Sequence, residues 1–239
     1  MKINLIIPAA GAGSRFSKNG ISIPKPLINL SGKPFFYWSV ISVAKYCELN
    51  SLTFVVLKEH IEKWSIDKEI YRYFPEASIV ELDKITSGAA ETCYKGLSNI
   101  NDNYPVLFND CDNFFMSSEL NSYLSENTID CDAALVTFKS NEDKYSYVEY
   151  DSDRNVVGTV EKKVVSSDAI CGAYLFRSAA KFIELYDKYL KDCPYNELFV
   201  SGLYNQKPLN IKIFNSDAHI PFGVPEEYDI AKKFFNMFK

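Results

Sequence analysis

Two stretches near the start of the chain bring small residues and cations together. Residues 5–16 read LIIPAAGAGSRF, an apolar run that gives way to Ala and Gly before Arg15. Glycines let a backbone turn tightly and place its N–H groups against phosphate oxygens, and a guanidinium adds further donors. Lys25 follows within PKPLINLSGKP (24–34), where two prolines hold its backbone extended. The pattern predicts a polyphosphate site, although an ordinary strand–loop–helix turn with solvated cations would look similar.

A third stretch, LFNDCDNFF (107–115), supplies carboxylates. In it Asp110 and Asp112 follow an apolar run. Carboxylate oxygens at a strand end suit Mg²⁺, which keeps several waters and takes phosphate oxygens from a substrate. The alternative is a strand-end turn in which the Asp residues serve only solubility. The stretch is therefore a candidate metal site.

Strand-like and helix-like segments alternate over the first half of the chain. This alternation predicts βαβ units, and hence a parallel sheet with helices on both faces. Ligands bind such sheets beyond the carboxyl ends of the strands, where the glycine-rich and acidic stretches both fall. The predicted strands cover 3–9, 52–58, 78–82 and 104–115, and the predicted helices cover 34–47, 60–74, 87–100 and 118–127.

From about residue 131 the chain becomes richer in alternating, β-forming segments. DSDRN (151–155) reads as a hairpin turn, and a helix is predicted over 178–192. A last strand over 209–215 and a last helix over 225–238 close the chain. We expect an α/β fold with a mixed, mainly parallel central sheet flanked by helices.

The overall composition suits a globular protein and excludes several classes. The 239 residues are 47% hydrophobic and carry a net charge of −5, so nothing favours general binding to nucleic acid or an anionic membrane. Six cysteines without a C-x-x-C pair indicate reduced thiols in a cytoplasmic protein, and two histidines exclude a His-rich metal site. No apolar run approaches the roughly 20 residues that span a bilayer, and the N-terminus does not resemble a signal peptide.

The glycine-rich loop, Arg15 and the P-K-P-L run at 24–27 together resemble the signature of the nucleotidylyltransferases. This family comprises the sugar-phosphate nucleotidylyltransferases and their cytidylyltransferase relatives, and the resemblance implies a GT-A-like α/β fold. It also implies one domain over 1–239, with a nucleotide-binding lobe (1–130) and a β-rich acceptor-binding lobe (131–239). The implied reaction is attack of an acceptor phosphate on the α-phosphorus of a nucleoside triphosphate, with release of pyrophosphate.

The resemblance assigns roles to the cations and the small residues. Arg15 would hold the β- and γ-phosphates, and Lys25 would lie near the α-phosphate. TSGAAET (86–92) is similar to the family segment that packs on the base. The residues expected to surround the nucleotide are Ala9, Ala10, Gly11, Ala12, Gly13, Asp83, Gly88 and Ala89.

In the second half, EKK (161–163) resembles the family's acceptor segment. Glu161 would contact the body of the acceptor and Lys162 its phosphate. Tyr147 and Glu197 complete the expected acceptor-binding residues.

The same resemblance gives Asp112 the role of Mg²⁺ ligand, with Asp110 as its partner. FGVPEEY (222–228) stands where many members read D-x-G-T-P-E-D, but Pro221 occupies the position of that Asp. Asp217, four residues upstream, is the weaker candidate for a second metal ligand.

Two other classes of function stay open. A GT-A glycosyltransferase binds a nucleotide sugar through a metal on D-x-D, which DCD (110–112) matches. A non-catalytic nucleotide sensor would keep the site without turnover. Release of pyrophosphate separates a nucleotidylyltransferase from both.

The expected substrates follow from the small residues and from the resemblance. A base pocket built from Ala and Gly favours a pyrimidine, and we expect CTP to be preferred over UTP because the amino group of cytosine can donate to a carbonyl or to Asp83. The full-length pattern is similar to small enzymes of capsule precursor synthesis. It implies a phosphorylated small acceptor such as L-glutamine phosphate, with a sugar 1-phosphate as the alternative. A homodimer is compatible with the sequence.

Overall fold

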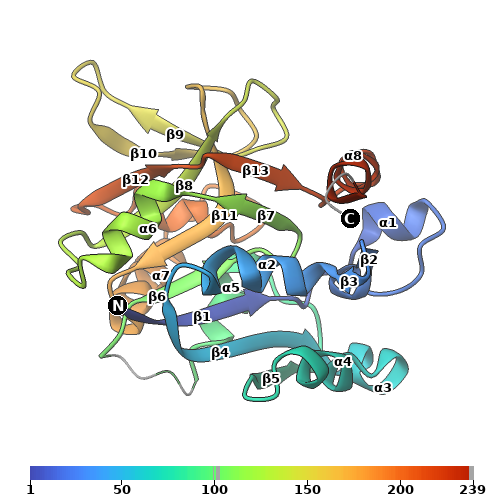
Figure 1. Cartoon of the computed structure of the whole chain (residues 1–239). Coiled ribbons are helices and arrows are strands. Elements are labelled where there is room, and N and C mark those ends of the chain that lie inside the picture. Colours follow the sequence, from blue (N-terminus) through green and yellow to red (C-terminus); the bar gives the residue numbers. More distant parts are fainter. Residues whose placement is uncertain (99, 101–102, 237–239) are drawn as a thin grey trace.

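A nine-stranded mixed sheet forms the centre of the computed structural model, which describes residues 1–98, 100 and 103–236 (Figure 1). Its strand order is β10-β9-β11-β6-β1-β4-β5, with β8 beside β11 and β12 beside β8. Strands β6, β1, β4 and β5 run parallel, whereas β11 is antiparallel to β6, β8 and β9. The predicted mixed, mainly parallel sheet is confirmed. The strands are β1 (Lys2–Pro8), β4 (Glu48–Leu57), β5 (Ser78–Leu82), β6 (Val106–Asn109), β8 (Ala133–Lys139), β9 (Tyr147–Tyr150), β10 (Val156–Val160), β11 (Asp168–Phe176) and β12 (Ile211–Asn215).

Helices cover both faces of this sheet. On one face, α2 (Phe35–Ala44), α4 (Ile66–Tyr73) and α6 (Ser118–Ser125) contribute apolar side chains to one core cluster that also contains β1 and β4. On the other face, α5 (Ala89–Lys95) and α7 (Ala179–Tyr189) contribute to a second cluster. A sheet buried on both faces explains the almost unbroken apolar strands β1 and β6, as expected for parallel strands. Within the described ranges, no helix is long and apolar enough to cross a membrane.

Smaller elements gather beyond the carboxyl end of β1. They are α1 (Ser14–Lys18), η1 (Lys25–Leu27), β2 (Asn29–Leu30), β3 (Lys33–Pro34), β7 (Asn113–Met116), β13 (Ala218–Pro221) and α8 (Pro225–Asn236), whereas η2 (Ser201–Asn205) packs against β10 and α7. Most of them meet in a third apolar cluster in which Phe35 packs on Phe222, with ring centroids 4.6 Å apart. Figure 1 shows α8 beside α1 at this end of the sheet. The last part of the chain thus lies next to the glycine-rich loop.

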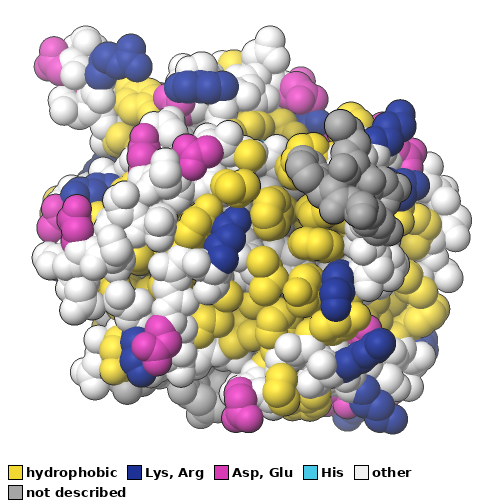
Figure 2. Space-filling model, in the orientation of Figure 1, with side chains coloured by type: hydrophobic (Ala, Val, Ile, Leu, Met, Phe, Trp, Pro, Cys, Tyr) yellow, Lys and Arg dark blue, Asp and Glu magenta, His cyan; other side chains and the backbone are white. Residues whose placement is uncertain are grey.

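An apolar surface covers α2 and β7 on the face drawn in Figure 2. Trp38 of α2 packs against Phe235 of α8, with centroids 4.4 Å apart, and Phe114 of β7 contacts both rings. The Lys45 ammonium lies 4.3 Å from the Phe114 ring, and burial lowers its pKa to about 8. These contacts hold α8 against α2, close to Phe222 and the loop that follows it.

Three predicted elements differ from the structure. The predicted helix over 60–74 is divided into α3 (Lys58–Trp64) and α4, because Ser65 adopts a left-handed conformation with φ of 51°. The predicted strand over 104–115 is two strands, β6 and β7, and the turn between them holds both Asp residues of the acidic stretch. The predicted helix over 34–47 ends at Ala44, since β4 already begins at Glu48.

The other predicted elements correspond to observed ones with shifted ends. The helices predicted over 87–100 and 225–238 cover α5 and α8, and their positions 99, 237 and 238 lie outside the described residues. Ser117 is the N-cap of α6, since its hydroxyl accepts a hydrogen bond from the Leu120 N–H at 3.2 Å. DSDRN forms the turn between β9 and β10.

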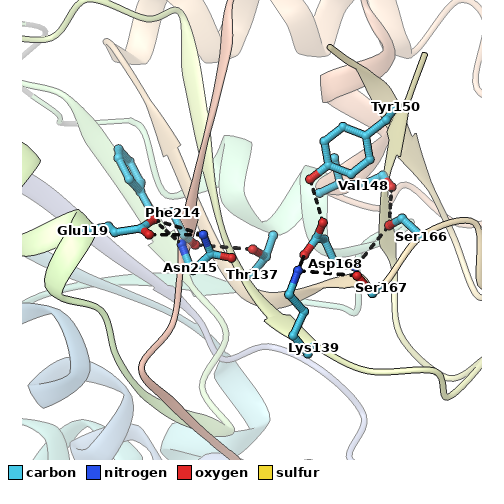
Figure 3. Close-up of polar contacts among 10 residues, drawn as sticks. All are labelled: Glu119, Thr137, Lys139, Val148, Tyr150, Ser166, Ser167, Asp168, Phe214 and Asn215. Carbon is cyan, nitrogen blue, oxygen red and sulfur yellow. Dashed lines mark hydrogen bonds and ion pairs between the residues drawn. The ribbon is translucent and has the colours of Figure 1, made fainter. Parts of the chain in front are cut away.

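Polar contacts tie the strands of the second half together (Figure 3). Glu119 of α6 accepts a hydrogen bond from the Asn215 backbone of β12 at 2.7 Å. Asp168, which starts β11 and is buried, pairs with Lys139 of β8 and accepts a hydrogen bond from the Tyr150 hydroxyl of β9 at 2.9 Å. One carboxylate therefore links three strands.

Replacing Asp168 by Ala is expected to lower the free energy of unfolding by about 1–3 kcal/mol, since the half-buried Tyr150 hydroxyl loses its acceptor. Urea unfolding followed by circular dichroism measures the loss. Lys139→Ala is the matched control, with an expected loss of less than about 1 kcal/mol because its side chain is 67% exposed. Equal losses in both variants would contradict the central role of the carboxylate.

Candidate active site

The glycine-rich loop leaves β1 and turns into the short helix α1. Gly13 has a left-handed φ of 60°, and a Cβ there would lie 3.5 Å from the Cβ of Lys25. A glycine therefore suits the point where the loop passes η1. A cavity of about 390 Å³, called here the glycine-loop cavity, opens beside the loop. It is lined by Pro8, Ala10, Gly11, Ala12, Lys25, Ile85, Thr86, Gly88, Ala89, Thr92, Asp110, Cys111, Asp112 and Glu197.

The opposite wall of this cavity is the start of α5. Gly88 has a φ of 154°, and a Cβ there would lie 2.5 Å from the backbone N and O atoms of Leu198. Backbone hydrogen bonds join the two segments, from Leu198 N–H to Ser87 O at 3.0 Å and from Ala90 N–H to Leu198 O at 2.8 Å. This close approach brings Glu197 to the same cavity as Gly88.

The acidic turn between β6 and β7 forms the base of the site. Its backbone is fixed by a hydrogen bond from the Asp110 N–H to Gly172 O at 2.9 Å, and Ser39 donates to the Asp110 carbonyl. The Lys25 ammonium lies 2.6 Å from Oδ2 of Asp112. Glycines let the backbone approach both carboxylates. A Cβ on Gly172 would lie 2.6 Å from Oδ2 of Asp110, and a Cβ on Gly223 would lie 2.5 Å from Oδ2 of Asp112.

Charges in this turn influence one another strongly. Burial and the nearby charge of Asp112 raise the pKa of Asp110 to about 7. Burial disfavours the charged form of Lys25, but Asp112, Cys111 and Asp110 together outweigh burial and raise the pKa of Lys25. Burial also raises the pKa of the Cys111 thiol to about 12, so this thiol stays protonated between the two carboxylates. The turn thus places the carboxyl groups of Asp110 and Asp112 beside one ammonium, that of Lys25.

A second cavity, called here the β11 cavity, lies on the other side of the acidic turn and measures about 180 Å³. Glu227 of α8 fixes one wall, because its Oε1 lies 2.9 Å from the Lys144 ammonium and accepts a hydrogen bond from the Tyr145 hydroxyl at 2.8 Å. Its Oε2 accepts a hydrogen bond from the Gly223 N–H at 3.1 Å. The lining residues are Arg15, Asp110, Asp112, Asn113, Lys144, Tyr145, Ser146, Ile170, Cys171, Gly172, Tyr174, His219, Pro221, Gly223, Val224 and Glu227.

Two side chains at the β11 cavity keep polar atoms without a partner among the described residues. They are Oδ1 of Asn113 and both ring nitrogens of His219, and all three atoms are buried. The His219 ring packs on Phe138, with centroids 4.1 Å apart, and burial lowers its pKa to about 4. The cavity therefore borders an uncharged imidazole and a free amide oxygen, which suit neutral polar groups of a ligand.

Several residues expected at the nucleotide do border the glycine-loop cavity, namely Ala10, Gly11, Ala12, Lys25, Gly88 and Ala89. Gly13 and Arg15 line an adjoining hollow that also contains Lys25 and Gly223. Glu197, expected at the acceptor, lies instead on the glycine-loop cavity.

Two residues expected at the nucleotide lie elsewhere. Ala9 is buried in the core, and its N–H donates to Val55 O at 2.8 Å, so it continues the pairing of β1 with β4. Asp83 is exposed and lines a neighbouring hollow with Thr86, outside the glycine-loop cavity. The predicted contacts of both side chains with a bound nucleotide are not supported by this geometry.

The structure also corrects the predictions for Tyr147 and Asp217. Tyr147 is fully buried in β9, and its hydroxyl donates to Glu142 O at 2.7 Å, so it does not border either cavity. Asp217 accepts a hydrogen bond from the Ser118 N–H at 2.7 Å and thereby caps α6. The pairing of β13 with β7 places Pro221 beside Asn113, and so Asp217 lies at the far end of this strand pair from Asp112.

Glu161 and Lys162 follow β10 and line neither cavity. Glu161 accepts hydrogen bonds from the hydroxyls of Ser146 and Ser201, and its charge contributes to the raised pKa of Asp110. Lys162 has a left-handed φ of 51°, and its ammonium lies 4.9 Å from the Phe199 ring. Ser146 connects Glu161 to the wall of the β11 cavity.

Sequence reasoning missed Lys144, His219 and Glu227 as cavity residues, and it assigned Asp110 only as a partner of Asp112. Asp110 borders both cavities. Glu227 stands in FGVPEEY, a stretch already singled out, and this was the available signal. The pairing of Glu227 with Lys144, 83 positions away along the chain, depends on tertiary contacts and had no sequence signal.

The donor set of the acidic turn fits Mg²⁺. Asp110 and Asp112 supply hard carboxylate oxygens, and both border the two cavities. Within the described ranges, no group of three or more His, Cys, Asp or Glu side chains is placed to hold a metal ion. Mg²⁺ bound here would therefore take its other ligands from water and from phosphate oxygens, as it commonly does.

Comparisons with known proteins agree with this architecture. A crystal structure of a nucleoside-diphosphate-sugar pyrophosphorylase from Vibrio cholerae RC9 is similar, with a TM-score of 0.79 and 26% identity over 96% of this chain and 99% of that chain. The inositol-1-phosphate CTP transferase from T. maritima shares the fold, with a TM-score of 0.73 and 16% identity over 98% of this chain and 96% of that chain.

A shorter similarity joins the chain to a curated relative, the 2-C-methyl-D-erythritol 4-phosphate cytidylyltransferase of Endomicrobium trichonymphae. The two are 41% identical over 66 residues, which is 28% of this chain and 29% of the length of that relative. The MobA-like NTP transferase domain matches residues 5–179, which include the glycine-rich loop and the acidic turn. Because this match covers most of the chain, the chain belongs to the MobA-like NTP transferase family and is a nucleotidyltransferase.

Proposed function

We propose that this nucleotidyltransferase transfers CMP from CTP to a phosphorylated small acceptor and releases pyrophosphate. One observation carries the proposal: Asp110 and Asp112 border both the glycine-loop cavity and the β11 cavity. A nucleotide in the first cavity and an acceptor in the second would therefore meet at the two carboxylates. Two anions that react need to be aligned and to have their charge neutralised, and no covalent nucleophile is required.

The cations of the chain would divide this work. Arg15 and the N–H groups of the glycine-rich loop would hold the β- and γ-phosphates, while Lys25 would contact the α-phosphate. Lys162 would meet the acceptor phosphate after moving from the Phe199 ring, and Glu161 would orient the acceptor body through Ser146. Asp112 would hold Mg²⁺, which supplies positive charge to the phosphate oxygens when bound.

The small side chains that line the glycine-loop cavity favour a pyrimidine base. Ala10, Gly88 and Ala89 offer little side-chain volume, and the cavity is about 390 Å³. Main-chain carbonyls near these residues would accept the amino group of cytosine, whereas the O4 of uracil would face them unpaired. That mismatch costs about 1–3 kcal/mol, or roughly tenfold in kcat/KM. The two cytidylyl-transferring relatives are consistent with CTP.

The acceptor is proposed to be an amino-acid-like phosphate such as L-glutamine phosphate, used in the synthesis of capsule precursors. A sugar 1-phosphate is the second candidate. The V. cholerae relative is named for nucleoside-diphosphate sugars, and the neutral polar atoms of Asn113 and His219 would suit sugar hydroxyls.

A screen of pyrophosphate release with four nucleoside triphosphates and a panel of phosphorylated acceptors tests both choices. We expect CTP to give the highest kcat/KM, UTP roughly tenfold less, and ATP and GTP no measurable turnover. Preference for a purine would contradict the base assignment, and efficient use of glucose 1-phosphate would favour the second candidate. Sugar transfer from a nucleotide sugar without pyrophosphate release would point to a glycosyltransferase.

A further inference from the structure

The Lys25 ammonium contacts Oδ2 of Asp112, a carboxylate that borders both cavities. Their N···O distance is 2.6 Å, and the side chains are 25% and 19% exposed. Lys25 is held by its backbone, because Leu27 N–H donates to Pro24 O at 2.9 Å and Ile28 N–H donates to Lys25 O at 3.1 Å.

A divalent cation on the same oxygen would conflict with this ammonium. Mg²⁺ binds carboxylate oxygen at about 2.0–2.1 Å, so the two cations would lie within a few ångströms of each other in a partly buried site. Their mutual repulsion disfavours simultaneous contact of both cations with Oδ2. The other flank of this oxygen is closed by the backbone, since Gly223 approaches it so closely that a Cβ would lie 2.5 Å away.

The Lys25 ammonium could occupy a second position. It lines the hollow that also contains Gly11, Gly13 and Arg15, where the proposed function puts the phosphates of the nucleotide. An anion there would attract the ammonium away from Asp112, and the flexible lysine stem allows the movement.

We infer that Lys25 blocks the metal-binding oxygen of Asp112 in the free protein, so that Asp112 takes a divalent cation only after nucleotide phosphates have drawn Lys25 away. This inference rests on the proposed function, since it needs a nucleotide in the glycine-loop cavity. Metal and nucleotide then bind with positive coupling, and by linkage each raises the affinity for the other by the same factor.

Titration of the free protein with Mn²⁺, followed by the electron paramagnetic resonance signal of unbound Mn²⁺, tests the inference without nucleotide or turnover. We expect Lys25→Met to bind Mn²⁺ at least about tenfold more tightly than the wild type, while Lys25→Arg, which keeps the cation, binds as weakly as the wild type. Lys33→Met is the matched control. Its ammonium lies on the rings of Tyr37 and Tyr73, and its loss should leave Mn²⁺ affinity unchanged. Equal affinity in Lys25→Met and the wild type would overturn the inference.

A second comparison does not depend on the folding of Lys25→Met. If Lys25 blocks Asp112, the wild type and Asp112→Asn should bind Mn²⁺ equally weakly in the absence of nucleotide. Binding to the wild type that is tenfold tighter than to Asp112→Asn would overturn the inference. Neither titration contains a substrate, so these outcomes are distinct from a failure of the proposed function, which would appear as a lack of pyrophosphate release by the wild type.

Discussion

Asp112→Asn is expected to lower kcat/KM by at least about 100-fold, because the amide keeps the shape of the side chain but removes the charge that is proposed to hold Mg²⁺. The variant also releases Lys25 from its ion pair, so the ammonium loses its 2.6 Å partner. Initial rates of pyrophosphate release with saturating Mg²⁺ measure the loss. Activity of the wild type should disappear with EDTA and return with Mg²⁺.

Asp217→Asn is the matched control for this experiment, since it makes the same chemical change at the other Asp once considered for the metal. Asp217 caps α6 at the far end of the β7–β13 pair, so its variant should keep kcat/KM within about twofold. Near-normal turnover in Asp112→Asn would refute the metal assignment and direct attention to Asp110. A large loss of kcat/KM in Asp217→Asn would instead contradict the view that Asp217 only caps α6.

The sequence pattern was sufficient for the sheet and for the segments that reach the site. Apolar strands followed by glycines or Asp residues predict what stands at the carboxyl ends of β1 and β6, because parallel strands bring these ends to one edge. Lys25 and Asp112 are 87 residues apart and yet form an ion pair, as expected for loops at that edge. What the pattern could not supply was the distance between them.

The errors have local physical causes. Ser65 interrupts a helix that the apolar periodicity alone would continue. Its left-handed conformation could not be predicted, because serine, unlike glycine, does not mark a left-handed position in a sequence. Tyr147 was expected at the acceptor, but it lies fully buried at the start of β9, next to the equally buried Val148. Ala9 failed for a related reason, since pairing with β4 continues one residue beyond β1.

The cavity walls that sequence reasoning missed are made by pairs distant along the chain. Lys144, Tyr145 and Glu227 meet because α8 is packed on α2 through aromatic rings, and no local motif encodes that contact. Pro221 could be recognised as a departure from the family pattern. The register of β13 with β7 places Pro221 at the β11 cavity, so the position that holds an Asp in many family members supplies no carboxylate there. This consequence could not be predicted from the sequence.

Gly88→Ala is expected to lower the free energy of unfolding by about 2–5 kcal/mol and to raise the KM for the nucleotide at least about tenfold. Its φ of 154° is strained for alanine, and the new Cβ would lie 2.5 Å from the backbone of Leu198. Relief requires the start of α5 to separate from the segment around Leu198, which breaks the hydrogen bond from Leu198 N–H to Ser87 O. The wall of the glycine-loop cavity opposite the glycine-rich loop would then move, because Ala89 and Glu197 both line the cavity beside this contact.

Gly20→Ala separates the two causes. Gly20 also has a positive φ, of 81°, but a Cβ there meets no atom within 4 Å, so its variant reports backbone strain alone, about 1–2 kcal/mol. Urea unfolding of both variants and steady-state kinetics with varied nucleotide give the comparison. If Gly88→Ala loses no more stability than Gly20→Ala and keeps the nucleotide KM, the contact with Leu198 does not shape the cavity. A larger loss with a raised nucleotide KM and an unchanged acceptor KM would tie this one backbone contact to nucleotide binding, since Gly88 lines the glycine-loop cavity and not the β11 cavity.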